Sequence, residues 1–287
     1  MTAQQHLDFV EKTLNPNSFF SKLISNHLHE YQPYYNTEKS AIYNEDCLTI
    51  LKALPENSIN MIFADPPYFL SNNGFTCQGG KMVSVNKGKW DKSKGFENDL
   101  EFHDLWISEC KRVLKPEGTI WISGTYHSIY SCGYVLQKNG FHMLNDICWF
   151  KPNASPNLSC RFFTASHETL LWARKDEKAK HTFNYDQIKN SDFPEDKIKQ
   201  PNLQMRSVWS INLTKPSEKQ YGKHPTQKPY DLLKRIVLAS TNEGDIVIDP
   251  FCGSGTTGVA CQNFHNRFFI GMEIEKEYCE IAKNRLS

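Results

Sequence analysis

Residues 246–258 read Ile-Val-Ile-Asp-Pro-Phe-Cys-Gly-Ser-Gly-Thr-Thr-Gly, an apolar run that passes into a glycine-rich turn. The apolar residues predict a buried strand, and the small residues 256–261 predict a helix directly after the turn. Glycines in such a turn let backbone N–H groups approach a ligand closely, and the start of a helix favours partial negative charge. This order of elements is typical of α/β proteins that bind a cofactor at the turn.

The next apolar run, residues 268–272, ends at Glu273, which follows Asp249 by 24 residues. An acidic residue at about this distance commonly accepts hydrogen bonds from ribose hydroxyls. A strand and capped helix without a ligand are the alternative, because a glycine pattern alone is weak evidence. The spacing G-x-G-x-x-G also matches nicotinamide-binding proteins, but the Asp-Pro-Phe before the glycines and the lack of an evident acid–base set argue against an oxidoreductase.

A second motif, Asp65-Pro66-Pro67-Tyr68, follows the apolar run 59–64 and is expected at the carboxyl end of a strand, where open α/β sheets bind ligands. The prolines fix the backbone and remove two N–H donors, which leaves carbonyl oxygens free to accept hydrogen bonds. The Asp65 carboxylate is a further acceptor, and the Tyr68 ring offers a flat face. Two acceptors beside a stacking surface suit an exocyclic amino group on a planar heterocycle. A proline-stiffened turn without chemistry is the alternative.

The remaining pattern is an alternation of short apolar runs and amphipathic stretches. Strands are predicted at residues 41–43, 60–64, 118–123, 142–150, 168–173, 245–249 and 268–272, and helices at 99–114, 229–240 and 256–261. The first helix places Phe102, Leu105, Trp106 and Val113 on one face. This alternation predicts an α/β fold with a mostly parallel, seven-stranded sheet and helices on both faces.

Two long polar segments interrupt the alternation: residues 71–95, which hold 5 of the 15 glycines, and residues 175–223. Such loops in a compact domain commonly bind a ligand or a partner. Residues 151–230 carry 14 Lys and Arg against 8 Asp and Glu, a net charge of +6, whereas the whole chain carries +1. This imbalance is typical either of a solvated surface or of a face that binds a polyanion.

The composition excludes several classes of protein. The 287 residues are 39% hydrophobic and 23% charged, which suits one large packed unit rather than a disordered or fibrous chain. The sequence holds no apolar run of membrane-spanning length, and residues 1–10 lack the apolar core of a signal peptide. Nine cysteines without a C-x-x-C pair indicate neither a disulfide framework nor a zinc site, so we expect a cytoplasmic protein without a bound metal.

Together the two motifs resemble those of the DNA amino-methyltransferases that use S-adenosylmethionine. In that family D-P-P-Y is the catalytic motif and F-x-G-x-G is the cofactor loop, matched here by Phe251, Gly253 and Gly255. The catalytic motif comes first in this chain, which is the permuted order of the beta class. The resemblance covers residues 41–286 and implies a Rossmann-like methyltransferase fold, S-adenosylmethionine as cofactor and DNA as substrate.

The resemblance also implies roles for individual residues and a division of the chain. The catalytic residues would be Asp65, Pro66, Pro67 and Tyr68. The cofactor would be held by Asp46, Cys47, Asp65, His224, Thr226, Lys228, Asp249, Phe251, Gly253, Ser254, Gly255, Thr256, Thr257 and Glu273. DNA would be contacted by Lys87, Lys89, Lys151, Arg161 and Arg206, each of which has a solvated surface charge as its alternative. We expect an N-terminal extension of residues 1–36, a catalytic domain of 37–174 and 224–287, and an inserted DNA-recognition segment of 175–223.

In the implied reaction, Asp65 and the Pro66 carbonyl accept hydrogen bonds from the two N–H groups of adenine N6. Tyr68 stacks on this base after it is flipped out of the duplex. Residues 65–72 and 156–164 are similar to members that modify adenine in GATC. Methylation of cytosine N4 is the first alternative, although that group more often has Ser before the two prolines. Methylation of RNA or of a protein amide, and a DNA-recognising regulator without catalysis, are further alternatives. The sequence leaves open a homodimer, a companion restriction endonuclease and a preference for duplex or single-stranded DNA.

Overall fold

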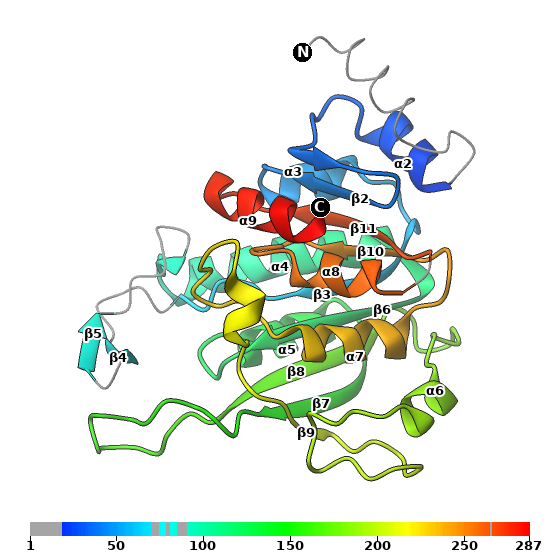
Figure 1. Ribbon diagram of the computed structural model, residues 1–287. Helices are drawn as coiled ribbons and strands as arrows, with labels where there is room; N and C mark the ends of the chain where they lie inside the picture. The colour runs from blue at the N-terminus through cyan, green and yellow to red at the C-terminus, as the bar shows by residue number, and fades with distance from the viewer. Residues whose placement is uncertain (1–18, 70–74, 79–80, 85–90, 265) are drawn as a thin grey trace.

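The computed structural model describes residues 19–69, 75–78, 81–84, 91–264 and 266–287 (Figure 1). Its centre is a nine-stranded sheet in the order β1-β2-β11-β10-β3-β6-β8-β7-β9. The strands are β1 Tyr35–Asn36, β2 Ser40–Tyr43, β3 Ile59–Ala64, β6 Leu114–Gly124, β7 His142–Phe150, β8 His167–Arg174, β9 Val208–Ser210, β10 Ile246–Asp249 and β11 Phe268–Met272. The neighbours β2, β11, β10, β3 and β6 are all parallel, whereas β8 runs antiparallel between β6 and β7.

All seven predicted strands form, and the predicted α/β fold with a mostly parallel sheet is confirmed. The predicted count of seven strands is two short, because β1 and β9 pair with the outer strands β2 and β7. These edge strands have only 2 and 3 residues, too few for a recognisable alternation of apolar and polar side chains. They lie in stretches that the sequence pattern identified only as polar.

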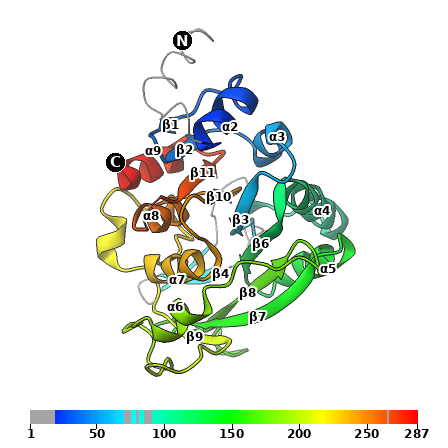
Figure 2. The same ribbon diagram turned by 90° about the vertical axis from the view of Figure 1, so that its right-hand side faces the viewer.

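Helices cover both faces of the sheet, as Figure 2 shows. One layer contains α2 Phe19–His27, α3 Cys47–Ala53, α4 Phe96–Val113 and α5 Ile129–Lys138, and the other contains α7 Tyr230–Ser240, α8 Thr256–Gln262 and α9 Lys276–Leu286. A short helix α6, Tyr185–Asn190, packs on α7, and a 3-10 turn η2 spans Pro216–Lys219. The apolar strands are thus buried on both faces, which is why they read as continuous hydrophobic runs.

Most of the predicted apolar helix faces are buried. In α4, Trp106 and Val113 are fully buried, but Leu105, predicted on the same face, is 47% exposed. Leu105 projects instead toward a cavity described below, so the periodic pattern continues past the core into a ligand-facing wall. In the described part of the predicted N-terminal extension, Phe20 of α2 is buried and stacks on Phe268 of β11 with ring centroids 5.0 Å apart.

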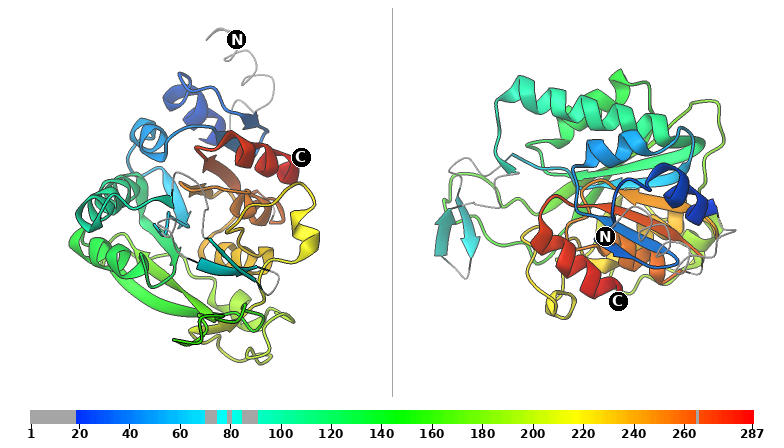
Figure 3. Two further views of the ribbon diagram at one scale, coloured as in Figure 1. Left: turned by 90° about the vertical axis from the view of Figure 1, so that its left-hand side faces the viewer. Right: turned by 90° about the horizontal axis from the view of Figure 1, so that it is seen from above.

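The loops that follow the carboxyl ends of the parallel strands all lie at one edge of the sheet. After β3 the chain includes a hairpin, β4 Phe75–Gln78 with β5 Lys81–Ser84, and after β7 it forms the loop 151–166; both project on the same side (Figure 1, Figure 3). Because ligands of open α/β sheets bind at this edge, the fold brings both predicted motifs to it. In the part of the chain that the structure describes, no helix is both long and apolar enough to cross a lipid bilayer.

Candidate active site

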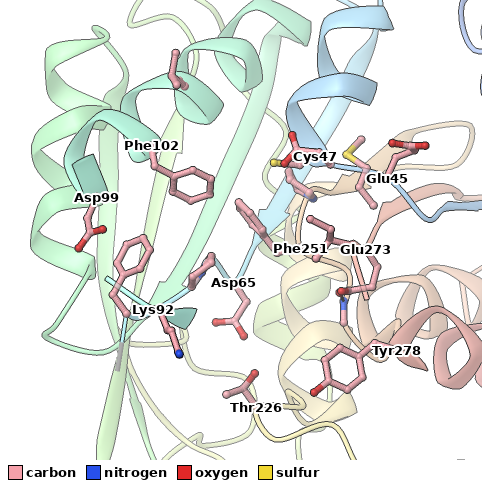
Figure 4. Close-up of a pocket in the computed structure, with 18 of the residues that line it drawn as sticks. Glu45, Cys47, Asp65, Lys92, Asp99, Phe102, Thr226, Phe251, Glu273 and Tyr278 are labelled. Carbon is pink, nitrogen blue, oxygen red and sulfur yellow. Dashed lines mark hydrogen bonds between the residues drawn. The ribbon is translucent and has the colours of Figure 1, made fainter. Parts of the chain in front are cut away.

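The two motifs leave the sheet from adjacent parallel strands. β3 and β10 are paired with Met61 opposite Val247, so Asp65 and the glycine turn emerge side by side. Both line a single cavity of about 480 Å³, which is bounded by Asp65 on one side and Gly253 on another. Figure 4 shows Asp65 between the α4 side, marked by Phe102, and the α9 side, marked by Tyr278. A carboxylate and a glycine-rich turn therefore face one ligand-sized space.

The glycine turn is held in place by Asp249, at the end of β10. Its carboxylate accepts the backbone N–H of Phe251 at 3.0 Å and the hydroxyl of Thr257 at 2.5 Å. Burial raises the pKa of Asp249 to about 7. Gly255 has a φ of 75°, and a Cβ at this position would lie 2.9 Å from the Cβ of Ala282 in α9. The turn can therefore follow this path only with glycine at position 255.

Glu273, at the end of β11, lines the cavity and reaches back to the turn. One carboxylate oxygen accepts the Gly253 N–H at 2.8 Å, and the other accepts the N–H of Glu275 at 2.8 Å. Burial raises the pKa of Glu273 to about 7. An acidic group at this position can accept hydrogen bonds from hydroxyl donors of a ligand, and contact with ribose hydroxyls stays a prediction of the sequence spacing.

The other walls of the cavity are flat and largely apolar. The Phe251 ring packs edge-on against Trp106 with centroids 5.2 Å apart, and the His224 ring meets Tyr278 at 4.3 Å. Asp46 caps α3 by accepting the N–H of Leu48 at 2.8 Å. The predicted cofactor residues that line this cavity are Asp46, Cys47, Asp65, His224, Thr226, Phe251, Gly253 and Glu273.

The other predicted cofactor residues do not line this cavity. Lys228, Asp249, Ser254, Thr256 and Thr257 border an adjoining crevice of about 20 Å³ that shares Asp65, Gly253 and other residues with the cavity, and Gly255 packs on α9. Arg285 donates to the hydroxyls of Ser254 at 3.0 Å and Thr256 at 2.8 Å, and Thr256 donates to the Lys228 carbonyl at 3.1 Å. These residues thus brace the turn that carries Gly253.

The Asp65-Pro66-Pro67-Tyr68 turn is fixed by Asp91, which the sequence reasoning did not single out. One oxygen of the fully buried Asp91 accepts the N–H groups of both Tyr68 and Phe69, at 2.9 and 2.8 Å. Phe69 has a φ of 57°, an unfavourable conformation for a residue with a side chain, which these two hydrogen bonds stabilise. An isolated aspartate in a polar loop carries no sequence signal for such a role.

The Asp65 carboxylate lies in a buried polar cluster. One oxygen accepts the Tyr68 hydroxyl at 2.5 Å, and the other contacts the Lys228 ammonium. The Tyr68 side chain is only 5% exposed, and the Lys228 ammonium lies 5.4 Å from the centre of its ring. Burial raises the pKa of Asp65, and Lys228 opposes that rise. The cluster presents a negative acceptor to the cavity beside a positive charge.

Two further residues complete this cluster: Glu168, for which the sequence predicted no role, and Lys151. Glu168, at the start of β8, contacts Lys228 at 3.6 Å, and Lys151 lies 3.2 Å from Glu168. Lys151, predicted to contact DNA, has a side chain only 10% exposed and is therefore part of the site rather than an open surface cation. Arg161 and Arg206 are exposed, whereas Lys87 and Lys89 lie outside the described residues.

Comparisons with known proteins agree with this geometry. The chain matches the family model of DNA methylases, which modify N6 and N4 amino groups, over residues 59–284. It is 53% identical over 256 residues to Type II methyltransferase M2.DpnII of Streptococcus pneumoniae, covering 89% of this chain and 92% of that protein. It is 46% identical over 258 residues to M2.MboI of Moraxella bovis, covering 88% of this chain and 90% of that protein.

Solved structures give the same result. The complex of M1.HpyAVI with SAM superimposes with a TM-score of 0.63 and 29% identity, over 86% of this chain and 99% of that chain. The cytosine-N4-specific PvuII DNA methyltransferase superimposes with a TM-score of 0.67 over 89% of each chain. The two chains are 21% identical, so this likeness shows a common fold alone. The predicted resemblance is confirmed: the chain belongs to the family of N6 and N4 DNA methylases and is a DNA methyltransferase.

Proposed function

We propose that this DNA methyltransferase transfers the methyl group of S-adenosylmethionine to N6 of adenine within the DNA sequence GATC. The observation that carries the proposal is the single cavity lined by both Asp65 and Gly253. An aspartate rather than a serine before Pro66 favours adenine over cytosine. The similarity of residues 65–72 and 156–164 to GATC-modifying members supports the recognition sequence.

The described residues fit S-adenosylmethionine. The cavity has a volume of about 480 Å³, within the range of small-molecule sites, and its walls combine flat apolar rings with carboxylates. Glu273 would accept hydrogen bonds from the ribose hydroxyls, and Asp46 and Phe251 would lie beside the adenine. His224 and Thr226 would hold the methionine end. The bound cofactor supplies an activated methyl group on a sulfonium centre.

The chain's own residues orient the target amine. The lone pair of adenine N6 is delocalised into the ring, so the amine is a poor nucleophile. Asp65 and the Pro66 carbonyl accept hydrogen bonds from the two N–H groups of this amine. These hydrogen bonds localise the lone pair on nitrogen and direct it toward the methyl group. Because N6 lies within the base stack of a duplex, the adenine must first be flipped out, at a cost of roughly a few kcal/mol.

The DNA side of the site is formed by exposed segments. The loop 151–166 carries Arg161 and two exposed aromatic rings, with Phe162 66% and Phe163 97% exposed. We propose that this loop and the inserted segment 175–223, which contains Arg206, contact the DNA duplex beside the flipped base. Steep dependence of DNA affinity on salt is expected, because phosphate contacts release counterions.

The decisive experiment measures methyl transfer by the full chain. Radiolabelled S-adenosylmethionine is offered with duplexes that contain GATC or a scrambled site, with single-stranded DNA and with RNA, and the product nucleoside is identified. N6-methyladenine in GATC supports the proposal. N4-methylcytosine, or label only in RNA, would contradict the assignment to adenine in DNA.

Asp65→Ala tests the chemical role in the same assay. We expect methyl transfer to fall by more than about a thousandfold, while cofactor binding measured by calorimetry stays within about threefold of the parent protein. Asp104→Ala is the matched control, since Asp104 is an aspartate on α4 that pairs with Lys138 at 2.8 Å outside the site. Full activity of Asp65→Ala would rule out the proposed mechanism.

Four further features are proposed: a cytoplasmic location, a homodimer, a companion endonuclease and a division of the chain. The eight cysteines whose side chains are described are free thiols, which suits action on DNA in a reducing cytoplasm. A homodimer and a companion restriction endonuclease are also proposed, the latter because the relatives named above are Type II methyltransferases. The division into residues 1–36, a catalytic domain of 37–174 and 224–287 and an inserted segment 175–223 is proposed as well, with the qualification that β9 of that segment pairs with β7 of the central sheet.

A further inference from the structure

Glu168 brings a second carboxylate to the catalytic aspartate. It reaches the site because β8 runs antiparallel to β6, so that the beginning of β8 lies at the edge where the parallel strands end. The register places Glu168 opposite Trp149 on β7, just before Lys151. The side chains of Glu168 and Asp65 are each only 12% exposed, so both carboxylates lie in a water-poor region.

One ammonium group serves both carboxylates. Lys228, 6% exposed, contacts one oxygen of Asp65 and lies 3.6 Å from Oε2 of Glu168. The Tyr68 hydroxyl lies at the same junction, 2.5 Å from Asp65, 2.9 Å from Lys228 and 3.4 Å from Glu168. The ammonium can therefore move from one carboxylate to the other by a small shift within a fixed set of partners.

Glu168 is anchored independently of Asp65. Its Oε1 pairs with Lys151 at 3.2 Å, and its Oε2 accepts the Ser123 hydroxyl at 3.4 Å. These contacts keep the second carboxylate in place whether or not Lys228 is close. The cluster holds two carboxylates and two ammonium groups, so its formal charge is balanced while Lys228 changes partner.

We propose that Glu168 is a positioning residue for methyl transfer, which draws the Lys228 ammonium away from Asp65 when the target amino group enters. The inference rests on the proposed function, because it assumes that Asp65 accepts an N–H of the substrate. A carboxylate held tightly by an ammonium is a weaker acceptor for a neutral amine than one that is released. With Glu168 as the alternative partner, Asp65 becomes available without leaving Lys228 as an unpaired buried charge.

The charges around Asp65 give the proposal a pH signature. Burial and the nearby Glu168 raise the pKa of Asp65, and Lys228 lowers it. Tyr68 also faces Asp65, and Asp249 of the β10 turn interacts with it electrostatically. Removal of the Glu168 charge should therefore shift the acid limb of the activity profile to lower pH, and removal of the Lys228 charge should shift it to higher pH.

The test is a double-mutant cycle with Glu168→Gln, Lys228→Gln and the double variant in the full chain, with kcat and pH profile measured on a GATC duplex. Glu168→Gln is expected to lower kcat about thirtyfold when Lys228 is present and less than about threefold when it is absent. Glu168→Asp, which keeps the charge, should restore the acid limb. Glu109→Gln, which removes a carboxylate paired with Arg112 at 2.8 Å on α4, is the matched control.

The outcomes separate this inference from the function on which it rests. A parent protein that methylates no adenine would overturn the proposed function. An active parent in which Glu168→Gln loses the same factor with and without Lys228, or leaves the acid limb unmoved, overturns only the role of Glu168. Thermal unfolding and calorimetric cofactor binding verify that the variants are folded. If Glu168→Gln does not fold, the kcat measurements of the same cycle are made with Glu168→Asp. Its shorter side chain increases the distance over which the Lys228 ammonium must move, so it should lower kcat only when Lys228 is present, and an equal loss without Lys228 would overturn the role of Glu168.

Discussion

The cofactor wall, formed by residues 249–257 with Glu273, and the loop 151–166 leave the same edge of the sheet but are held in different ways. In the wall, Asp249, Arg285 and Glu273 fix the turn through partly buried hydrogen bonds. In the loop, Asn157 organises the turn by accepting the Ser159 N–H at 3.0 Å and donating to the Phe162 carbonyl at 2.6 Å, while the side chains around it are exposed.

In the proposed function, this difference corresponds to two different ligands, the cofactor at the wall and DNA at the loop. A small cofactor is bound by groups preorganised around it, so its site must be rigid before binding. A DNA backbone is contacted by exposed cations and rings at the surface, so the corresponding residues need exposure more than burial. We therefore expect changes in the wall to act on cofactor affinity and changes in the loop to act on DNA affinity.

Among the changes considered, Gly255→Val in the wall is expected to cause the largest loss, and this loss should be in cofactor affinity. The left-handed φ of 75° and the 2.9 Å approach of a Cβ to Ala282 would force the turn away from its position. We expect cofactor affinity to fall by more than about a hundredfold in calorimetry. Gly133→Ala is the control, because a Cβ there makes only an ordinary contact of 3.4 Å with Leu171. Retained affinity in Gly255→Val would show that the wall is deformable.

A change in the loop should lower DNA affinity and leave cofactor affinity unchanged. Phe163 is 97% exposed beside Arg161, and its ring is available to stack on a base or to fill the gap left by a flipped adenine. Phe163→Ala is expected to weaken binding of a GATC duplex about thirtyfold, since a base–aromatic contact contributes roughly 1–3 kcal/mol. Cofactor affinity should stay unchanged. Phe163→Trp should bind DNA like the parent, and equal losses in Phe163→Trp and Phe163→Ala would exclude stacking.

The wall should also respond to pH. Burial raises the pKa of Glu273 to about 7, so this carboxyl is ionised above pH 7 and protonated below it. Ribose hydroxyls donate better to the ionised form, so cofactor affinity should fall as the pH decreases below 7, by at most about tenfold per pH unit. Glu273→Gln should bind more weakly at pH 8 and show a shallower profile between pH 6 and 8 than the parent, since Asp249 of the same wall keeps its own raised pKa. A parent protein with equal affinity at pH 6 and 8 would contradict this role for Glu273.

The smallest effect is expected for a single cation of the loop. Arg161 is exposed, so its replacement by alanine removes a phosphate contact without leaving a cavity. Arg161→Ala should weaken DNA binding about threefold and reduce the slope of log affinity against log salt by about one. Lys180→Ala, at another basic position of the 151–230 stretch, is a suitable comparison. An unchanged salt slope would place Arg161 away from the phosphates.

Much of the wall could be predicted from the sequence, because its ligand requires small residues and acids at fixed positions along the chain. Apolar runs located β3 and β10, and the offset between Asp249 and Glu273 marked the end of β11. The residue pattern placed the loop only within a basic stretch, because exposed residues follow no period, and the assignment of Arg161 to DNA came from the resemblance of residues 156–164. The burial of Lys151 could not be predicted, since charge alone does not distinguish a surface lysine from one paired with Glu168 in a cleft.

The part of the site that the motifs missed depends on strand order. Glu168 reaches Asp65 only because β8 is inserted antiparallel between β6 and β7, a pairing between segments far apart in sequence. Local patterns report which residues form a strand but not which strand lies beside it. The same limit explains β1 and β9, whose few residues are extended because longer neighbours pair with them.

The two hydrogen bonds that Asp91 accepts also bear on protein engineering. They join Tyr68 and Phe69 to Asp91, so the residues on either side of the segment 70–90 are held together at one carboxylate. That segment can then be exchanged for one of another length, as a cassette, without moving the catalytic turn, provided that both anchoring residues are kept. Grafting of new DNA-contacting sequences onto this enzyme should therefore begin after position 69 and end before position 91.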